Sequence, residues 1–314
     1  MLRTAKLVLA LGTLSVLNLW WAAPLSGAAH SFVQRRQIGT SATTSLAPIR
    51  FRDDRNEGLL VSGWVNDEGP FTFALDTGAG VSIVSSRLAT SVHLTTTRSK
   101  KTLVGGLSTS PISSNEQAIA TRISLGHSTN VVPGKPVLAI VQMLPGGIDG
   151  ILDPTDLFGG MAYSIDLPNH QLLVFDGATN GLDLTRIPKD GAVVRWVREA
   201  SGDRPFVRLG DGRLALLDTG SGFGLAVNQP SSEAGQHHIR GDVTDLGGGA
   251  VQFRQIAPTT VSIGALVLRG VPTDVLIGVP SGTPLIIGRR ALYPFKITFD
   301  PSARLIAFEP TQRN

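Results

Sequence analysis

Cysteine does not occur anywhere in the 314 residues. A chain without thiols has no disulfide framework, no thiolate metal site and no cysteine nucleophile. Charged residues are also sparse, at 17%, whereas 42% of the residues are hydrophobic. This balance is typical of a globular protein and argues against intrinsic disorder. Stability must therefore come from the hydrophobic core, which a chain of this length can build.

Several common functional motifs are missing as well. The sequence has no Gly-x-Ser-x-Gly elbow and no Walker A loop, so serine hydrolases and phosphate-loop enzymes have no support. The formal net charge of +4 is small and dispersed, and we expect no nucleic-acid partner. His237 and His238 are adjacent in a polar stretch without a third ligand. We therefore expect neither a metal ion nor an organic cofactor.

The N-terminus has the order of a secretory signal peptide. MLRTAK is basic, the following stretch is apolar, and small residues then allow cleavage after Ala28 or Ala29. Residues 1–29 are therefore predicted to direct export to the periplasm or the medium. The apolar stretch is long for a signal peptide, so an uncleaved membrane anchor stays open as the alternative. Residues 30–47 are polar and rich in Ser and Thr, which indicates a linker or a short pro-segment.

From residue 48 onward, short apolar segments alternate with turn residues, a pattern that predicts mostly β structure. The tripeptide Asp-Thr-Gly occurs twice in this region. FTFAL leads into Asp76, and RLALL leads into Asp218. A single Asp-Thr-Gly is ordinary turn chemistry, because Asp bonds its own backbone and Gly accepts positive φ. A repeated tripeptide in a repeated context indicates a shared function.

A second pair of segments supports this repetition. Residues 150–175 parallel residues 285–308, each with two apolar residues, a short helix and a closing hairpin. The period of roughly 140 residues is too long for a solenoid and predicts two similar β lobes. The N-terminal lobe is expected over 48–180 and the C-terminal lobe over 188–314, with a cleft between them.

Two facing lobes would bring Asp76 and Asp218 together. Two close carboxylates cannot easily both ionise, so they share one proton and titrate as a coupled pair. One could then act as general base toward water while the other hydrogen-bonds a substrate carbonyl. The threonines of both tripeptides supply hydroxyls to hold the two loops, and the glycines let backbone approach the carboxylates. These residues are Thr77, Gly78, Thr219 and Gly220.

The chain resembles the aspartic proteases of the pepsin and retropepsin clan, with both lobes in one chain. The residues that carry the resemblance are ALDTGA at 74–79, LLDTGS at 216–221 and Ile286-Ile287-Gly288. The resemblance implies a bilobal acid-protease fold with Asp76 and Asp218 as catalytic dyad and Ser221 among its supports. It also implies a monomer, as an internal pseudo-dimer, that cleaves extended peptide or protein substrates. The expected flap residues, which would cover the substrate, are Gly105, Gly106, Gly247, Gly248 and Gly249.

Three departures from the family pattern leave alternatives open. Asp153 stands where the second lobe has Gly288, and the expected flap segments contain no tyrosine. Arg289 and Arg290 follow Gly288 where an acidic residue is common, and we interpret them as a solvated helix start. The competing function is a catalytically inactive peptide-binding module of the cell envelope. A dimer in which each lobe pairs with another copy is a further possibility.

Overall fold

The computed structural model of the chain describes residues 46–104, 112–176, 187–199, 202–228, 241–244, 249–280 and 282–311. These residues belong to one compact unit and are mostly β, which confirms the expected fold class. The predicted signal peptide, nearly all of the predicted linker and most of the stretch between the two expected lobes, 181–187, lie outside the described residues. Leu46, at the end of the predicted linker, is already buried in the core. In the described ranges, none of the helices has the length and apolar character needed to span a membrane.

We call residues 49–174 the first repeat. Its strands are β1 (Ile49–Arg50), β2 (Arg52–Asp54), β3 (Gly58–Val65), β4 (Glu68–Leu75), β5 (Ile83–Ser85), β6 (Thr96–Val104), β7 (Ile112–Ile119), β8 (Ile123–Leu125), β9 (Val137–Val141), β10 (Gly150–Leu152), β11 (Tyr163–Asp166) and β12 (Gln171–Val174). Its helices are α1 (Ser86–Ser91), the 3₁₀ turn η1 (Pro145–Gly147) and α2 (Pro154–Leu157).

We call residues 192–310 the second repeat. Its strands are β13 (Ala192–Arg195), β14 (Val197–Glu199), β15 (Gly202–Arg208), β16 (Leu214–Asp218), β17 (Leu225–Asn228), β18 (Gly241–Thr244), β19 (Ala250–Ile263), β20 (Leu266–Ile277), β21 (Leu285–Gly288), β22 (Phe295–Asp300) and β23 (Leu305–Pro310). It also contains the short helix α3 (Arg289–Leu292).

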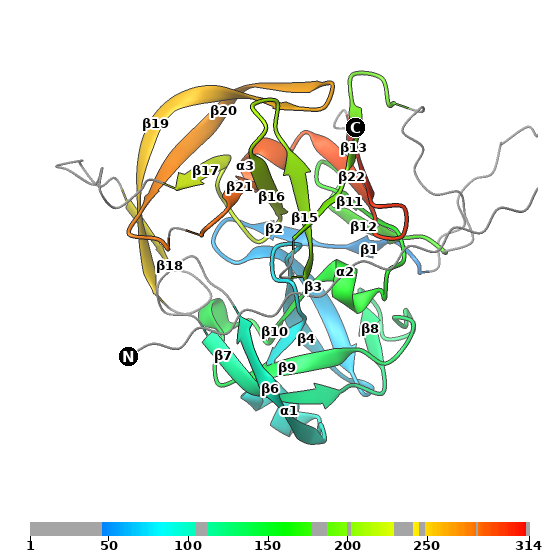
Figure 1. Ribbon diagram of the computed structural model, residues 1–314. Coiled ribbons are helices and arrows are strands. Elements are labelled where there is room, and N and C mark those ends of the chain that lie inside the picture. Colours follow the sequence, from blue (N-terminus) through cyan, green and yellow to red (C-terminus); the bar gives the residue numbers. More distant parts are fainter. Residues whose placement is uncertain are drawn as a thin grey trace, which may run out of the picture. The chain divides into compact units, whose positions relative to one another are not determined.

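The two repeats have the same strand order, which Figure 1 allows the reader to follow. The first sheet runs β2-β3-β4-β10-β5-β9-β7-β6, and the second runs β14-β15-β16-β21-β17-β20-β19-β18. Strand for strand, the two lists correspond in chain order. In each, the strand before Asp-Thr-Gly pairs in parallel with a short buried strand, β10 or β21. The sequence similarity of the two halves therefore reflects one topology used twice.

A third sheet joins the two repeats and was not expected from the sequence. Its order is β1-β12-β11-β22-β23-β13, so the closing hairpin of each repeat lies at the centre. β11 and β22 pair antiparallel, with Ile165 opposite Ile297. The hydroxyls of Ser164 and Thr298 are 2.7 Å apart across the same junction. The strands that close each repeat are therefore hydrogen-bonded to those of the other.

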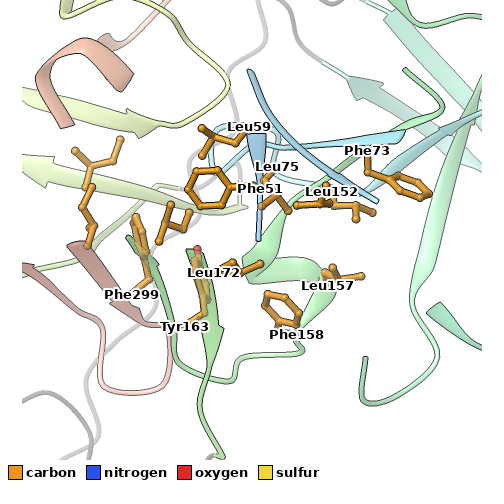
Figure 2. Packing of buried hydrophobic residues seen from close by; sticks show 14 of the residues in the cluster. Phe51, Leu59, Phe73, Leu75, Leu152, Leu157, Phe158, Tyr163, Leu172 and Phe299 are labelled. Carbon is orange, nitrogen blue, oxygen red and sulfur yellow. The ribbon is translucent and has the colours of Figure 1, made fainter. Parts of the chain in front are cut away.

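The apolar sides of these sheets pack into one large core. Figure 2 shows part of it, with Tyr163 and Phe299 side by side. Their rings are stacked at a centroid distance of 4.9 Å, and both side chains are fully buried. Phe158, at the end of α2, contacts the other side of this cluster through Tyr163. The core thus fixes the short helix α2, which lies directly after the strand that pairs with β4.

Candidate active site

Both Asp-Thr-Gly tripeptides lie at the ends of equivalent strands. Asp76 directly follows β4, and its N–H donates to the carbonyl oxygen of Leu152 at 3.0 Å. Asp218 is the last residue of β16 and lies opposite Gly288 in the parallel strand β21. The apolar residues before each aspartate are buried, so each loop leaves the sheet at a fixed point. The strand pairing therefore sets the position of both carboxyl groups.

The two loops are tied together through their threonines, which are fully buried. The Thr77 hydroxyl donates to the carbonyl oxygen of Leu217 at 2.7 Å and accepts the N–H of Thr219 at 3.1 Å. The Thr219 hydroxyl donates to the carbonyl oxygen of Leu75 at 3.2 Å and accepts the N–H of Thr77 at 3.2 Å. Each threonine thus satisfies backbone groups of the other repeat, and this reciprocal set of bonds holds the loops in register.

The glycines bring each carboxyl group against the opposite loop. A Cβ on Gly220 would lie 2.5 Å from Cγ of Asp76, closer than real contacts allow. Gly78 lies against the carboxyl of Asp218 in the same way. The two carboxyls thus lie beside each other, and the side chains influence each other's pKa. Only glycine permits this approach at either position, because any side chain would push the carboxylates apart.

The environment raises the pKa of both carboxyls. Burial raises the pKa of Asp76, and it raises the pKa of Asp218 well above its ordinary value, an effect to which the negative charge of Asp76 adds. Backbone hydrogen bonds act in the opposite direction. Gly78 donates to Asp76 at 2.8 Å, and Ser221 donates to Asp218 at 2.9 Å. Both aspartates are only half-buried, so a ligand can reach them. The pair therefore keeps a proton at a pH where an isolated exposed aspartate has lost it.

Comparison with protein families matches residues 61–152 to a family described as aspartyl protease. This match supports an aspartyl protease of the pepsin and retropepsin clan. The matched segment contains Asp76, Thr77 and Gly78 and ends at Leu152, whose carbonyl oxygen accepts the N–H of Asp76. None of the curated proteins compared with the chain matches it.

Directly after the matched aspartyl protease segment comes Asp153, which is 1% exposed. Its side chain caps α2 by accepting the N–H of Thr155 at 2.8 Å. Burial raises the pKa of Asp153 to about 8, and the negative charges of Asp76 and Asp156 add to the effect. The structure thus places another carboxyl, which is fully buried, behind the loop of Asp76. The sequence showed the substitution, but not that the side chain would be buried.

The expectation of a solvated helix start is wrong for Arg289, although Arg290 is exposed as expected. Arg289 is 5% exposed, and its Nε lies 3.2 Å from the Asp53 carboxylate. Its guanidinium donates to four carbonyl oxygens, those of Thr219 (3.0 Å), Gly220 (3.1 Å), Asp54 (3.0 Å) and Arg55 (3.4 Å). The side chain turns inward because these orphan carbonyls and the Asp53 charge lie there. The only sequence signal was an arginine directly after a buried strand.

In the sequence, the expected flap glycines fall between the two strands of two hairpins. In the aspartyl protease segment β6 pairs with β7, and in the second repeat β18 pairs with β19. Gly105, Gly106, Gly247 and Gly248 lie outside the described residues, and Gly249 directly precedes β19. Ser221 contacts Asp218 through its backbone N–H, while its hydroxyl accepts the N–H of Phe223 at 3.3 Å.

Proposed function

We propose that the chain is an aspartic endopeptidase that hydrolyses peptide bonds with Asp76 and Asp218 as a dyad sharing one proton. The observation that carries this proposal is the pair of carboxyls at the ends of two equivalent strands, each packed against the glycine of the opposite loop. The reciprocal threonine bonds support it, because a shared proton requires fixed placement of both groups. The aspartyl protease family segment supports the same class of reaction.

The reaction follows from a dyad that carries one negative charge. The ionised carboxyl takes a proton from a water molecule, whose oxygen attacks the carbonyl carbon of the peptide bond. The protonated carboxyl gives its proton to the carbonyl oxygen, which produces a tetrahedral diol. Collapse of this intermediate breaks the C–N bond: the protonated carboxyl gives its proton to the leaving nitrogen, and the other carboxyl takes a proton from one hydroxyl of the diol, which becomes the product carboxylic acid. The dyad then again holds a single proton.

An extended peptide is the substrate that the surroundings favour. We expect the hairpins β6–β7 and β18–β19 to offer backbone groups to a bound strand, because the expected flap glycines fall between the two strands of each hairpin in the sequence. Residues next to each aspartate in the chain belong to a separate apolar cluster. The first consists of Leu60, Ala74, Ile83, Val141, Leu144, Ile148 and Ile151 with Ala79 and Val81. The second consists of Phe223, Ala226, Val251, Leu276, Val279 and Ile286 with Val243 and Phe253. We therefore expect apolar substrate side chains beside the cleaved bond.

The test is cleavage of a peptide library by the purified chain across pH. Asp76→Asn and Asp218→Asn should each reduce kcat/KM about a hundredfold or more, because neither carboxyl performs both proton transfers alone. Asp67→Asn is the matched control, since Asp67 is exposed in a turn and pairs with Arg122 at 3.0 Å. If either dyad variant kept activity close to that of the control, the shared dyad would be wrong.

The alternative is an inactive peptide-binding module of the envelope, which the buried Asp153 behind the first loop keeps open. A statine-type transition-state mimic distinguishes the two. An active dyad should bind the mimic far more tightly than a substrate peptide of the same side chains, and Asp218→Asn should abolish that preference. A module would bind both peptides alike, in the wild type and in the variant.

We also propose export to the periplasm or the medium, with a membrane location only where the N-terminal segment stays uncleaved. The motivation is the signal-like order of residues 1–29. The protease is proposed to act as a monomer, because both aspartates and both threonine ties come from one chain. Activity that depends on protein concentration in the manner of a dimer would contradict this.

A further inference from the structure

The two aspartate loops are braced from behind in different ways. Behind Asp218, the bracing is made of backbone. The N–H groups that open α3 donate to carbonyl oxygens of the loop that carries this aspartate. These bonds are Gly288 to Gly224 (3.0 Å), Arg289 to Ser221 (2.9 Å) and Arg290 to Phe223 (3.2 Å). A Cβ at position 288 would lie 2.5 Å from the carbonyl oxygen of Phe223. Position 288 therefore has room for no side chain.

Behind Asp76, the bracing runs through side chains instead. The N–H of Asp153 donates to Oγ of Ser82 at 3.3 Å, and the N–H of Ser82 donates to the Asp156 carboxylate at 2.9 Å. The first turn of α2 is capped by Asp153 itself, which accepts the N–H of Thr155. Ser82 is fully buried. The loop and the helix are thus linked through two side chains, those of Ser82 and Asp156, where the other repeat uses main chain.

We propose that Asp153 is a positioning residue for Asp76: its side chain caps α2, and the cap holds in place the Asp153 N–H and the Asp156 carboxylate, which bind the loop at Ser82. The proposal rests on the proposed peptidase function. Asp153 directly follows Leu152, whose carbonyl oxygen holds the N–H of Asp76 at 3.0 Å. A loss of the cap at Asp153 therefore loosens the residue next to the Asp76 contact, as well as the start of α2.

The chemical state of Asp153 defines what a substitute must provide. With a pKa near 8, its carboxyl is protonated at acid and neutral pH and adds no second negative charge behind Asp76. A protonated carboxyl has one acceptor oxygen and one donor group, and the asparagine amide has the same pattern. The groups that face it are Asp76, Asp156 and Tyr163. The negative charges of Asp76 and Asp156 disfavour ionisation of Asp153, and a charged Asp153 would raise the pKa of Tyr163. Asparagine should therefore replace it well, and glycine should not.

The experiment compares the wild type with Asp153→Asn and Asp153→Gly at a pH well below 8, measuring kcat and KM separately. Asp153→Asn should keep kcat within about twofold. Asp153→Gly, which installs the residue of the other repeat, should lower kcat about tenfold to a hundredfold with KM little changed, since misplacement of a catalytic group acts on the transition state. Asp67→Asn is the control, and thermal unfolding shows that each variant is folded in the assay.

Three results would overturn the proposal: full kcat in folded Asp153→Gly, a kcat loss in Asp153→Asn as large as in the glycine variant, or a shift in KM alone. If Asp153→Gly does not fold, Ser82→Ala takes its place, because it removes the oxygen that accepts the N–H of Asp153. Its kcat should fall in the same range, and an unchanged kcat would count against the proposal.

Failure of the peptidase function itself has a different signature, because the wild type would then cleave nothing. In that case, carboxyl-carbon NMR titration of Asp76 tests whether Asp153 positions Asp76 without any measurement of cleavage. Coupled titration of Asp76 with Asp218 should persist in Asp153→Asn and be altered in Asp153→Gly. Identical titration curves in all three chains would overturn the positioning role.

Discussion

The buried carboxyl of Asp153 makes a quantitative prediction about stability. In the unfolded chain its pKa is about the ordinary value of 3.8, whereas burial raises it to about 8 in the folded protein. Between these values the folded state binds a proton that the unfolded state has released, so stability falls as the pH rises. This group alone should lower the free energy of unfolding by about 1.4 kcal/mol per pH unit, about 6 kcal/mol from pH 3.8 to 8.

Asp153→Asn removes this titration and keeps the cap on α2. Both chains should therefore have similar stability near pH 4, and the variant should become progressively more stable than the wild type toward pH 8. The measurement is urea unfolding at a series of pH values, followed by circular dichroism. Asp218→Asn is present in both chains, so that neither digests itself and the coupled titration of the dyad is absent from both curves.

Asp67→Asn in the same background controls for the loss of one negative charge, because Asp67 is exposed. Its curve should run nearly parallel to that of the wild type, within about 1 kcal/mol, because only the exposed ion pair with Arg122 is lost. If the curves of Asp153→Asn and wild type were also parallel from pH 4 to 8, Asp153 would be ionised in the folded protein. The reasoning from burial would then be refuted.

Three further substitutions test the contacts around the dyad. Gly220→Ala should abolish cleavage while the chain stays folded, because the added methyl would lie 2.5 Å from Cγ of Asp76; wild-type kcat would contradict this. Thr77→Val should lower the free energy of unfolding by about 1–3 kcal/mol, since it leaves buried backbone partners unsatisfied, and urea unfolding measures the loss. Arg289→Lys should destabilise the chain by about 3–5 kcal/mol, because an ammonium cannot reach Asp53 and four carbonyls together; a loss under 1 kcal/mol would show that the fork geometry is unimportant.

Local patterns in the sequence were sufficient to predict the strands that lead into both aspartates. Alternating or continuous apolar residues mark β4 and β16, and the turn residues that follow mark the loops. The short helix α1 was also predictable, because Ser85 is a good N-cap and accepts the N–H of Leu88 at 3.2 Å. These features depend on neighbours in the chain, which is why one sequence suffices.

Contacts between distant segments could not be predicted in the same way. Arg289 is buried because carbonyl oxygens from two separate segments converge on it, and nothing beside it in the sequence indicates this. The burial of Asp153 likewise depends on Ser82 and on the packing of α2 against the core. The sheet that joins both repeats was missed because β1 and β13 are short, and their place in a sheet depends on pairing with strands that are distant in the sequence.

The junction between β11 and β22 has an evolutionary consequence. In a single repeat on its own, β11 would be an unpaired edge strand, although its four residues are all buried in the full chain. Such an exposed edge tends to pair with the same strand of a second copy. In a homodimer built that way, any mutation would appear on both sides of the dyad. Fusion of the two copies removes that restriction. Here Asp153 occurs once, behind Asp76, and Gly288 with Arg289 occurs once, behind Asp218. One chain can thus evolve two unlike halves of a single site.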